Sequence, residues 1–239
     1  MLHLSMNRWR NRVPADCPGC GCRQRGQGLC PVCLAQLRPS DAQPRCPRCA
    51  HPLTSRGCPD CGVQLPAYDR VVAAFDHTGL GRELIHAYKL RRQLSLAPLL
   101  ADWLAQAVLD VLEPEAHPDW IVPVPARRAA LRQRGFSPPA EIARLLARRV
   151  RVPSCLEIVQ RQHEGTRQAG LARVQRLQAQ AGVFVCEVPA QVQGRRIAVV
   201  DDVLTTGATL QSMAAVLKDA GAFRVEGWVL ARAVGHRPS

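Results

Sequence analysis

The sequence predicts an α/β fold with a mostly parallel sheet wrapped by helices on both faces, preceded by a small cysteine-rich module. Three observations favour this class. Nine of the 11 cysteines stand before residue 62, strand-like and helix-like stretches alternate from Tyr68 onwards, and hydrophobic residues make up 47% of the 239-residue chain. A chain of this length suits one medium domain plus a small module.

The composition of the chain divides it into four parts. Pro66 interrupts local structure where the cysteine-rich texture ends. The expected parts are an N-terminal tail (1–16), a metal-binding module (17–62), a linker (63–67) and an α/β domain (68–239). Because no secretion signal and no membrane-length apolar run is visible, we expect a cytoplasmic protein.

The spacing of apolar residues predicts the elements of the α/β domain in order. Strands are expected over Arg70–Phe75, Trp120–Val124, Arg196–Val200 and Phe223–Ala231. Helices are expected over Leu80–Leu90, Leu96–Leu112, Pro139–Val150, Leu171–Ala181 and Ala208–Ala220. Proline suits the first turn of a helix and Gly221 suits the end of the last one. Ligands of such sheets bind beyond the carboxyl ends of the strands.

Four Cys-x-x-Cys pairs stand in the N-terminal module: Cys17/Cys20, Cys30/Cys33, Cys46/Cys49 and Cys58/Cys61. Four thiolates form a closed tetrahedral zinc site, so eight cysteines predict two structural zinc ions. Nine residues separate the first two pairs and eight separate the last two. Such short loops favour sequential pairing, because closing them costs least entropy, while interleaved pairing stays open. A redox or oxidised cluster is the alternative.

An acidic pair and a threonine-rich loop follow the strand Ile197–Val200. Adjacent carboxylates at Asp201 and Asp202 are costly without a partner, which vicinal hydroxyls or a hydrated cation would supply. The loop opens a helix, whose first N–H groups attract an anion, and Gly207 is expected to let the backbone approach that anion closely. The loop residues are Thr205, Thr206, Gly207, Ala208 and Thr209. The pattern predicts a ligand with a diol and a phosphate, such as ribose 5-phosphate; the alternative is a plain helix N-cap beside two exposed acids.

This run resembles the phosphoribosyl-pyrophosphate (PRPP) signature of the type I phosphoribosyltransferases. The resemblance implies that Asp201 and Asp202 grip the ribose hydroxyls and that Thr205 to Thr209 hold the 5-phosphate. It also implies that magnesium bridges the pyrophosphate and the ribose, and that the fold is of the type I phosphoribosyltransferase kind.

With its cysteine-rich module, the chain is similar to the ComF/GntX family, which is linked to DNA uptake in competent bacteria. The resemblance covers Cys17 to about Ala233, and it departs from the family where Ser137-Pro138 replace the usual Asn-Gln. Supporting matches are His86-Ala87-Tyr88-Lys89, Val122-Pro123-Val124-Pro125, Arg132-Gln133-Arg134-Gly135-Phe136, Arg161, Thr166, Gln168, Leu171 and Arg173.

Further basic residues lie outside the phosphate loop. Arginine binds pyrophosphate in a bidentate manner, so the loop after Val122–Pro125 is a candidate pyrophosphate loop or a plain exposed basic loop. Its arginines are Arg127, Arg128, Arg132 and Arg134. The segment 161–173 is a flexible lid or a plain surface loop, with Arg161, Thr166, Gln168 and Arg173 as its candidate residues. Lys89 is an anion ligand or, more simply, a solvated helix end.

Two functions fit these residues. The first is an enzyme that displaces pyrophosphate from PRPP with a nitrogen nucleophile; no catalytic base is assigned, because the acceptor is unidentified. The second is a binding protein that keeps the PRPP fold as a sensor or scaffold and contacts single-stranded DNA or proteins of DNA uptake. A net charge of +13 favours anionic partners, whereas an aromatic content of 4% argues against a base-stacking platform.

Overall fold

The computed structural model describes residues 14–37, 44–61, 65–162 and 182–234. The predicted helix Leu171–Ala181 and the candidate lid residues Thr166, Gln168 and Arg173 lie outside these ranges. The strands are β1 (Pro14–Asp16), β2 (Arg23–Arg25), β3 (Arg70–Asp76), β4 (Trp120–Pro123), β5 (Val159–Arg161), β6 (Phe184–Cys186), β7 (Arg196–Leu204) and β8 (Arg224–Arg232). The α-helices are α2 (Pro31–Leu37), α3 (Gly79–Lys89), α4 (Ala97–Leu109), α5 (Arg128–Arg134), α6 (Pro138–Val150), α8 (Pro189–Val192) and α9 (Ala208–Asp219), with short 3₁₀ turns η1 (Leu94–Leu96) and η2 (Pro114–Ala116).

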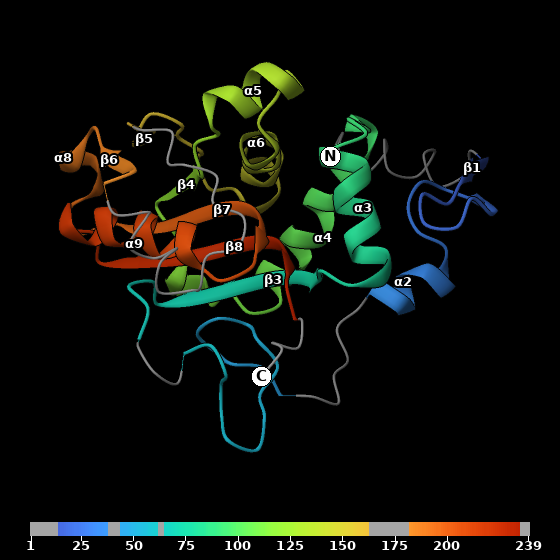
Figure 1. The fold of residues 1–239 in the computed structure, drawn as a ribbon, viewed down its shortest axis with the longest axis horizontal. Helices are drawn as coiled ribbons and strands as arrows, with labels where there is room; N and C mark the ends of the chain where they lie inside the picture. The colour runs from blue at the N-terminus through green and yellow to red at the C-terminus, as the bar shows by residue number, and fades with distance from the viewer. Residues whose placement is uncertain (1–13, 38–43, 62–64, 163–181, 235–239) are drawn as a thin grey trace.

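The centre of the molecule is a four-stranded parallel sheet with the order β3-β8-β7-β4 (Figure 1). The middle strands β7 and β8 are almost wholly buried, which explains their continuous apolar runs. Strand β7 is longer than expected, because its pairing with β8 continues in register from Arg196 to Leu204. We had predicted that the acidic pair follows the strand. The pair instead lies inside the strand.

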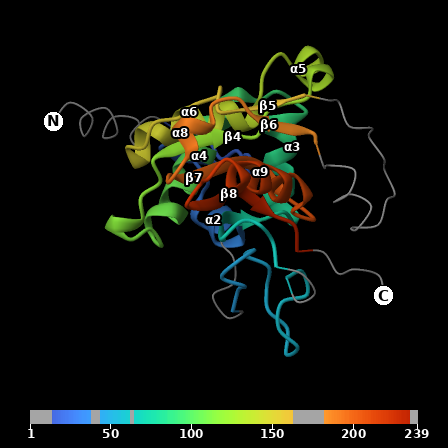
Figure 2. The ribbon, with the colours of Figure 1, turned by 90° about the vertical axis from the view of Figure 1, so that its left-hand side faces the viewer.

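Helices cover both faces of this sheet, which confirms the predicted α/β class (Figure 2). Helices α3, α4 and α6 pack on one face, and α9 packs on the other. Helix α6 begins where the sequence departs from the family pattern that it resembles. Ser137 accepts a hydrogen bond from the Ala140 N–H (3.4 Å), and two prolines follow it. The substitution thus serves as a helix N-cap. Within the described residues, no helix is both long and apolar enough to cross a membrane.

The cysteine-rich segments pack against the α/β domain at two places (Figure 1). The hairpin β1–β2 and helix α2 lie beside α3. Leu29 and Leu80 pack against Cys17, Cys30 and Cys33. Residues 44–61 lie under the sheet, where Arg45 forms a two-pronged ion pair with Asp76 at the end of β3 (2.8 and 2.7 Å). The first segment therefore contacts α3, and the second contacts the carboxyl end of β3.

Gly81 determines how closely α3 approaches the end of β3. A Cβ atom at this position would lie 2.2 Å from the Asp76 carbonyl oxygen and 2.8 Å from the Phe75 ring. A backbone carbonyl cannot yield as a flexible side chain can, so the helix would have to shift. Helix α3 carries Lys89 to the acidic pair, and Gly81 therefore contributes to the geometry of that edge.

We predict that Gly81→Ala destabilises the protein by about 1–3 kcal/mol, the usual cost of overpacking. Chemical denaturation of both proteins measures the free energy of unfolding. The control is Glu83→Ala, an exposed position on the same helix, which should change that free energy by less than about 0.5 kcal/mol. Equal effects of the two substitutions would contradict the tight contact with β3.

Candidate functional site

A small cavity opens where β7 ends and α9 begins. Its volume is about 120 Å³. Its lining includes every residue of the predicted phosphate loop together with one of the two acids: Asp201, Val203, Leu204, Thr205, Thr206, Gly207, Ala208, Thr209 and Leu210. The structure therefore brings the loop and Asp201 together at the carboxyl edge of the sheet, where ligands of parallel α/β folds bind.

The loop that lines this cavity contains unused backbone hydrogen-bond donors. Among the described residues, no protein group accepts from the N–H of Thr205, Thr206 or Gly207. The next N–H, that of Ala208, reaches only the Thr206 hydroxyl at 3.4 Å. Together with the positive end of α9, these donors form a concave site suited to an anion.

Gly207 has a structural role in addition to the one we expected. Its φ of +79° lies in the left-handed region, which residues with a side chain rarely adopt. A Cβ atom at this position would point to the Tyr68 hydroxyl, 3.1 Å away. The glycine is thus required by the backbone conformation and by the nearby Tyr68 hydroxyl, and the close approach of an anion stays a prediction.

The two acids face opposite sides of the sheet, because successive residues of a strand alternate. Asp201 lines the cavity on the α9 side, and its carboxylate accepts from the Asp202 N–H at 2.8 Å. Burial raises the pKa of Asp201 to about 7, with a further contribution from the Asp202 charge. Asp202 is buried on the α3 side and forms an ion pair with Lys89, whose Nζ lies 2.7 Å from the carboxylate.

Lys89 is therefore not a solvated helix end. It belongs to a small group of basic side chains that α3 and the end of β3 bring to the acidic pair. The His77 and His86 rings lie 6.2 Å apart, centroid to centroid. Burial lowers the pKa of His77, and the charges of His86 and Lys89 lower it further, which favours the neutral ring.

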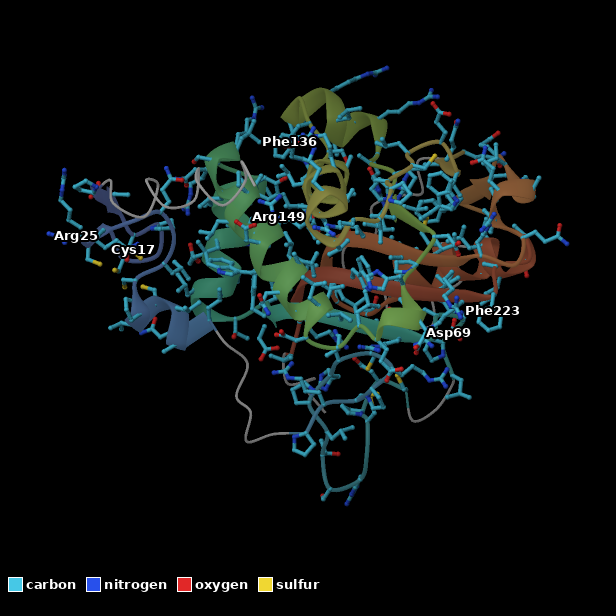
Figure 3. The ribbon with its side chains drawn as sticks, turned by 180° about the vertical axis from the view of Figure 1, so that it is seen from behind. Cys17, Arg25, Asp69, Phe136, Arg149 and Phe223 are labelled. Atoms are coloured by element: carbon cyan, nitrogen blue, oxygen red, sulfur yellow. The ribbon has the colours of Figure 1, made fainter. Side chains whose placement is uncertain are left out.

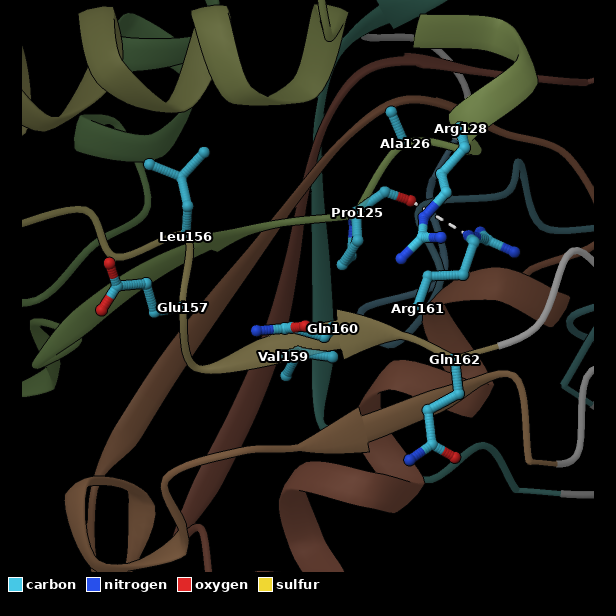
Figure 4. A pocket seen from close by; sticks show the side chains of 9 residues that line it. All are labelled: Pro125, Ala126, Arg128, Leu156, Glu157, Val159, Gln160, Arg161 and Gln162. Atoms are coloured by element: carbon cyan, nitrogen blue, oxygen red, sulfur yellow. Dashed lines mark hydrogen bonds between the residues drawn. The ribbon is translucent and has the colours of Figure 1, made fainter.

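A second, larger cavity of about 300 Å³ lies between the predicted pyrophosphate loop and strand β5 (Figure 4). It brings Arg128 and Arg161 together, with Glu157, Gln160 and Gln162 on the β5 side. Arg161 donates from Nε to the Pro125 carbonyl (3.2 Å) and stacks over the Phe184 ring (4.6 Å). The remaining predicted arginines lie on or beside α5 and do not line this cavity: Arg127, Arg132 and Arg134.

The cysteines form two clusters in sequential pairing. The first consists of Cys17, Cys20, Cys30 and Cys33, and the second consists of Cys46, Cys49, Cys58 and Cys61. Within each cluster the four sulfur atoms lie within 4.8 Å of one another. The first cluster, marked by Cys17 in Figure 3, lies at the α3 side of the molecule. The second packs into the core beneath the sheet.

Sequence analysis missed Arg232, the last residue of β8. This side chain is 2% exposed. Its Nε donates to the Cys49 carbonyl, its Nη1 to the carbonyls of Leu204 and Thr205, and its Nη2 pairs with Asp60. The available signal was a single arginine at the end of the apolar run Trp228–Ala231, a position where a charge is buried only if it is paired.

Comparison with known proteins covers most of the chain. The sequence profile of the phosphoribosyl transferase domain family matches residues 98–238. Competence protein F of Haemophilus influenzae is 30% identical over 211 residues, which cover 86% of this chain and 91% of that protein. DNA utilization protein YhgH of Escherichia coli K12 is 32% identical over 210 residues, which cover 86% of this chain and 90% of that protein.

A solved glutamine PRPP amidotransferase from B. subtilis is 21% identical and covers 56% of this chain and 26% of its own, with a TM-score of 0.38. That likeness adds nothing to the family match. The profile and the two full-length relatives agree with the motifs read from the sequence. The chain belongs to the ComF/GntX family, whose α/β part is a phosphoribosyl transferase domain.

Proposed function

We propose that this protein binds PRPP with magnesium at the carboxyl edge of its sheet and acts in the handling of incoming DNA. The observation that carries the proposal is the cavity in which Asp201 faces the unpaired N–H groups of the threonine loop. Such a cavity offers anion donors at one end and a hydroxyl acceptor at the other. The names of the two relatives, which concern competence and DNA use, support the link to DNA.

In this proposal each part of PRPP meets its own group of residues. The 5-phosphate occupies the loop of Thr205, Thr206, Gly207, Ala208 and Thr209, and the ribose hydroxyls face Asp201 and Asp202. The pyrophosphate lies toward Arg128 and Arg161, which already share a cavity. Magnesium, when bound with PRPP, neutralises charge on the pyrophosphate. A transferase of this kind joins a nitrogen nucleophile to the anomeric carbon as pyrophosphate leaves.

Lys89 competes with the ribose for the Asp202 carboxylate in this proposal. Its ammonium group forms an ion pair with the Asp202 carboxylate. A ribose that uses Asp202 must therefore share the carboxylate with Lys89 or displace it. Lys89 is 30% exposed at its side chain, so it has room to turn toward the ligand's phosphates instead.

A second candidate function is direct contact with nucleic acid through α5. This seven-residue helix has no buried residue. It carries Arg128, Arg132 and Arg134, and Arg127 directly precedes it. A helix that contributes nothing to the core and is rich in arginine suits contact with phosphates, which would be strongly salt-dependent. Single-stranded DNA that binds equally at low and high salt would contradict this role.

We further propose that each cysteine cluster holds one structural zinc ion. The sulfur atoms of Cys20 and Cys30 lie 3.7 Å apart, and those of Cys49 and Cys58 lie 3.5 Å apart. Sulfur atoms on a tetrahedral zinc stand about 3.8 Å apart, so the donors fit the ion. We keep the division into a tail (1–16), a double zinc module (17–62), a linker (63–67) and an α/β domain (68–239), in a cytoplasmic protein whose reducing surroundings preserve the thiolates.

The first prediction from this proposal concerns the acidic pair. Asp202→Asn should weaken binding of PRPP–magnesium roughly ten- to a hundredfold, the loss expected for one charge-assisted hydrogen bond. Calorimetric titration of the parent and the variant measures both affinities. Asp69→Asn is the matched control, since Asp69 is also paired with a lysine, Lys218 at 2.8 Å, but precedes β3 at the opposite edge of the sheet. A parent protein that ignores PRPP–magnesium would refute the proposed function.

The second prediction concerns pH. With a pKa of about 7, Asp201 is mostly protonated at pH 6 and mostly ionised at pH 8, so its capacity to accept hydroxyls rises about tenfold across this range. Affinity for PRPP–magnesium should rise accordingly. The raised pKa also means that Asp201 destabilises the fold progressively as pH rises from about 4 to 7.

The control for this pH dependence is Asp201→Asn. PRPP itself titrates near neutrality, and the variant reports that contribution alone. The difference between the two curves of PRPP–magnesium affinity against pH should therefore report the ionisation of Asp201. Parallel profiles for parent and variant would show that the carboxylate does not face the ligand.

The third prediction concerns metal content. Elemental analysis of protein prepared in reducing buffer should find two zinc ions per chain, since two clusters of four cysteines are present. Replacing Cys46 and Cys49 by serine should reduce the content to one, because the first cluster does not depend on those thiols. Cys155→Ser, outside both clusters, should leave two. A zinc content near zero in the unsubstituted protein would exclude structural zinc.

A further inference from the structure

Arg232 is the point at which the second cysteine cluster and the phosphate loop meet. It ends β8, the strand between β3 and β7, so its side chain stands in the middle of the carboxyl edge. The guanidinium is 2% exposed and all of its nitrogens are engaged. Its partners come from three parts of the chain: β7 with the loop after it, the second cluster, and the residue after Arg232 itself.

The cluster side of this junction consists of two contacts. Nε donates to the carbonyl of Cys49, a cluster residue, at 2.9 Å. Nη2 forms an ion pair with Asp60, which stands between the cluster residues Cys58 and Cys61 and has a side chain that is 12% exposed. The geometry of these two acceptors is set by the four cysteines around them. Anything that reorganises the cluster must therefore move the partners of a buried charge.

The loop side consists of two successive carbonyls. Nη1 lies 2.9 Å from the Leu204 oxygen and 2.6 Å from the Thr205 oxygen. In a trans peptide the C=O group of one residue and the N–H group of the next point to opposite sides of the chain. By holding both carbonyls toward itself, Arg232 turns the N–H groups of Thr205 and Thr206 away from its guanidinium, and both residues line the cavity.

We propose that Arg232 is a positioning residue that couples metal binding at the second cysteine cluster to phosphate-ester binding at the threonine loop. The inference rests on the proposed function of that loop. An ordered second cluster keeps Cys49 and Asp60 in place, these hold the guanidinium, and the guanidinium orients two of the N–H donors that receive the phosphate. Loss of metal from the second cluster lowers the affinity for the phosphate ester, although no cysteine touches it.

The coupling must act in both directions, because two linked binding equilibria affect each other by the same factor. A phosphate ester in the loop stabilises the carbonyl orientation that Arg232 requires, and thereby the cluster. Bound ligand should therefore raise the affinity of the second cluster for zinc by the same factor. The first cluster packs against α3 and has no such link to the loop among the described contacts, so its affinity for zinc should not change.

The decisive variants alter the cluster side of the junction and leave Arg232 itself in place, since loss of a buried arginine risks the fold. Asp60→Asn keeps the shape but removes the charge, and Asp60→Ala removes the contact. The matched control is Arg45→Gln, which breaks the other ion pair between the same cluster and the sheet, at Asp76. Zinc content and thermal melting show that each variant is folded and loaded.

Ribose 5-phosphate with magnesium is the probe, titrated by calorimetry. We expect Asp60→Asn to weaken its binding about fivefold, at the lower end of usual coupling energies, with a larger loss in Asp60→Ala and no loss in Arg45→Gln. If the parent binds and all three variants bind equally well, or if Arg45→Gln is weakened as much as Asp60→Ala, the coupling is wrong while the proposed function stands. A parent that binds neither ribose 5-phosphate nor PRPP overturns both.

Zinc affinity gives the second readout. Zinc is partitioned at equilibrium between the protein and a chromogenic chelator, with and without ribose 5-phosphate, and the Cys17→Ser, Cys20→Ser double variant isolates the second cluster. The ligand should raise the zinc affinity of the second cluster in this variant and lose this effect when Asp60→Ala is added. A zinc affinity that ignores the ligand in both proteins contradicts the proposal.

Discussion

The burial of one guanidinium group at the end of the central strand determines how the parts of this protein fit together. Arg232 is enclosed at 2% exposure, where an unpaired charge would cost several kcal/mol. The planar fork of arginine can meet acceptors on several sides at once, which a lysine cannot. The chain supplies these acceptors from the cysteine-rich segment and from the loop after β7, and both segments are therefore held at the same edge of the sheet.

The electrostatics of that edge follow a consistent pattern. Asp202 has a lysine from α3 as its partner, whereas Asp201 faces the cavity with a raised pKa and forms no ion pair with a lysine in the described part of the chain. Alternation along the strand separates two neighbouring carboxylates that would otherwise repel each other on the same side. In this structure Asp202 is thus paired with Lys89, and a ribose that uses Asp202 must share or displace that lysine. Lys89 is placed for this by α3, which Gly81 allows to approach the end of β3.

Much of this architecture follows from the sequence, because apolar spacing reports burial directly. The strands β3, β4, β7 and β8 and the helices α3, α4, α6 and α9 lie where the periodicity predicts them, within a few residues. The end of β7 was misplaced because acidic residues normally leave a strand, and only the pairing with β8 keeps Asp201 and Asp202 in the ladder. The short elements α5 and β5–β6 carry too few apolar residues to show a period.

Some of the site residues could likewise be predicted from the sequence, and others could not. The position of the threonine loop at the carboxyl edge and the grouping of the cysteines were predictable, since each follows from the spacing of residues in the sequence. The partners of Asp202 and the role of Arg232 were not, because they depend on which distant segments the fold brings together: Lys89 is 113 positions from Asp202, and Cys49 is 183 positions from Arg232. The reason for Gly207 also appeared only with the tertiary structure, which places Tyr68 beneath it.

The central claim is that the loop after β7 receives a phosphate through its backbone N–H groups. Nuclear magnetic resonance of the ¹⁵N-labelled, zinc-loaded protein tests this directly, because a hydrogen bond to a phosphate moves an amide proton downfield. On titration with ribose 5-phosphate and magnesium, the amide signals of Thr205, Thr206 and Gly207 should move most, ahead of those on α5. Signals from this loop that stay in place while others shift, or a spectrum without any change, would contradict the account.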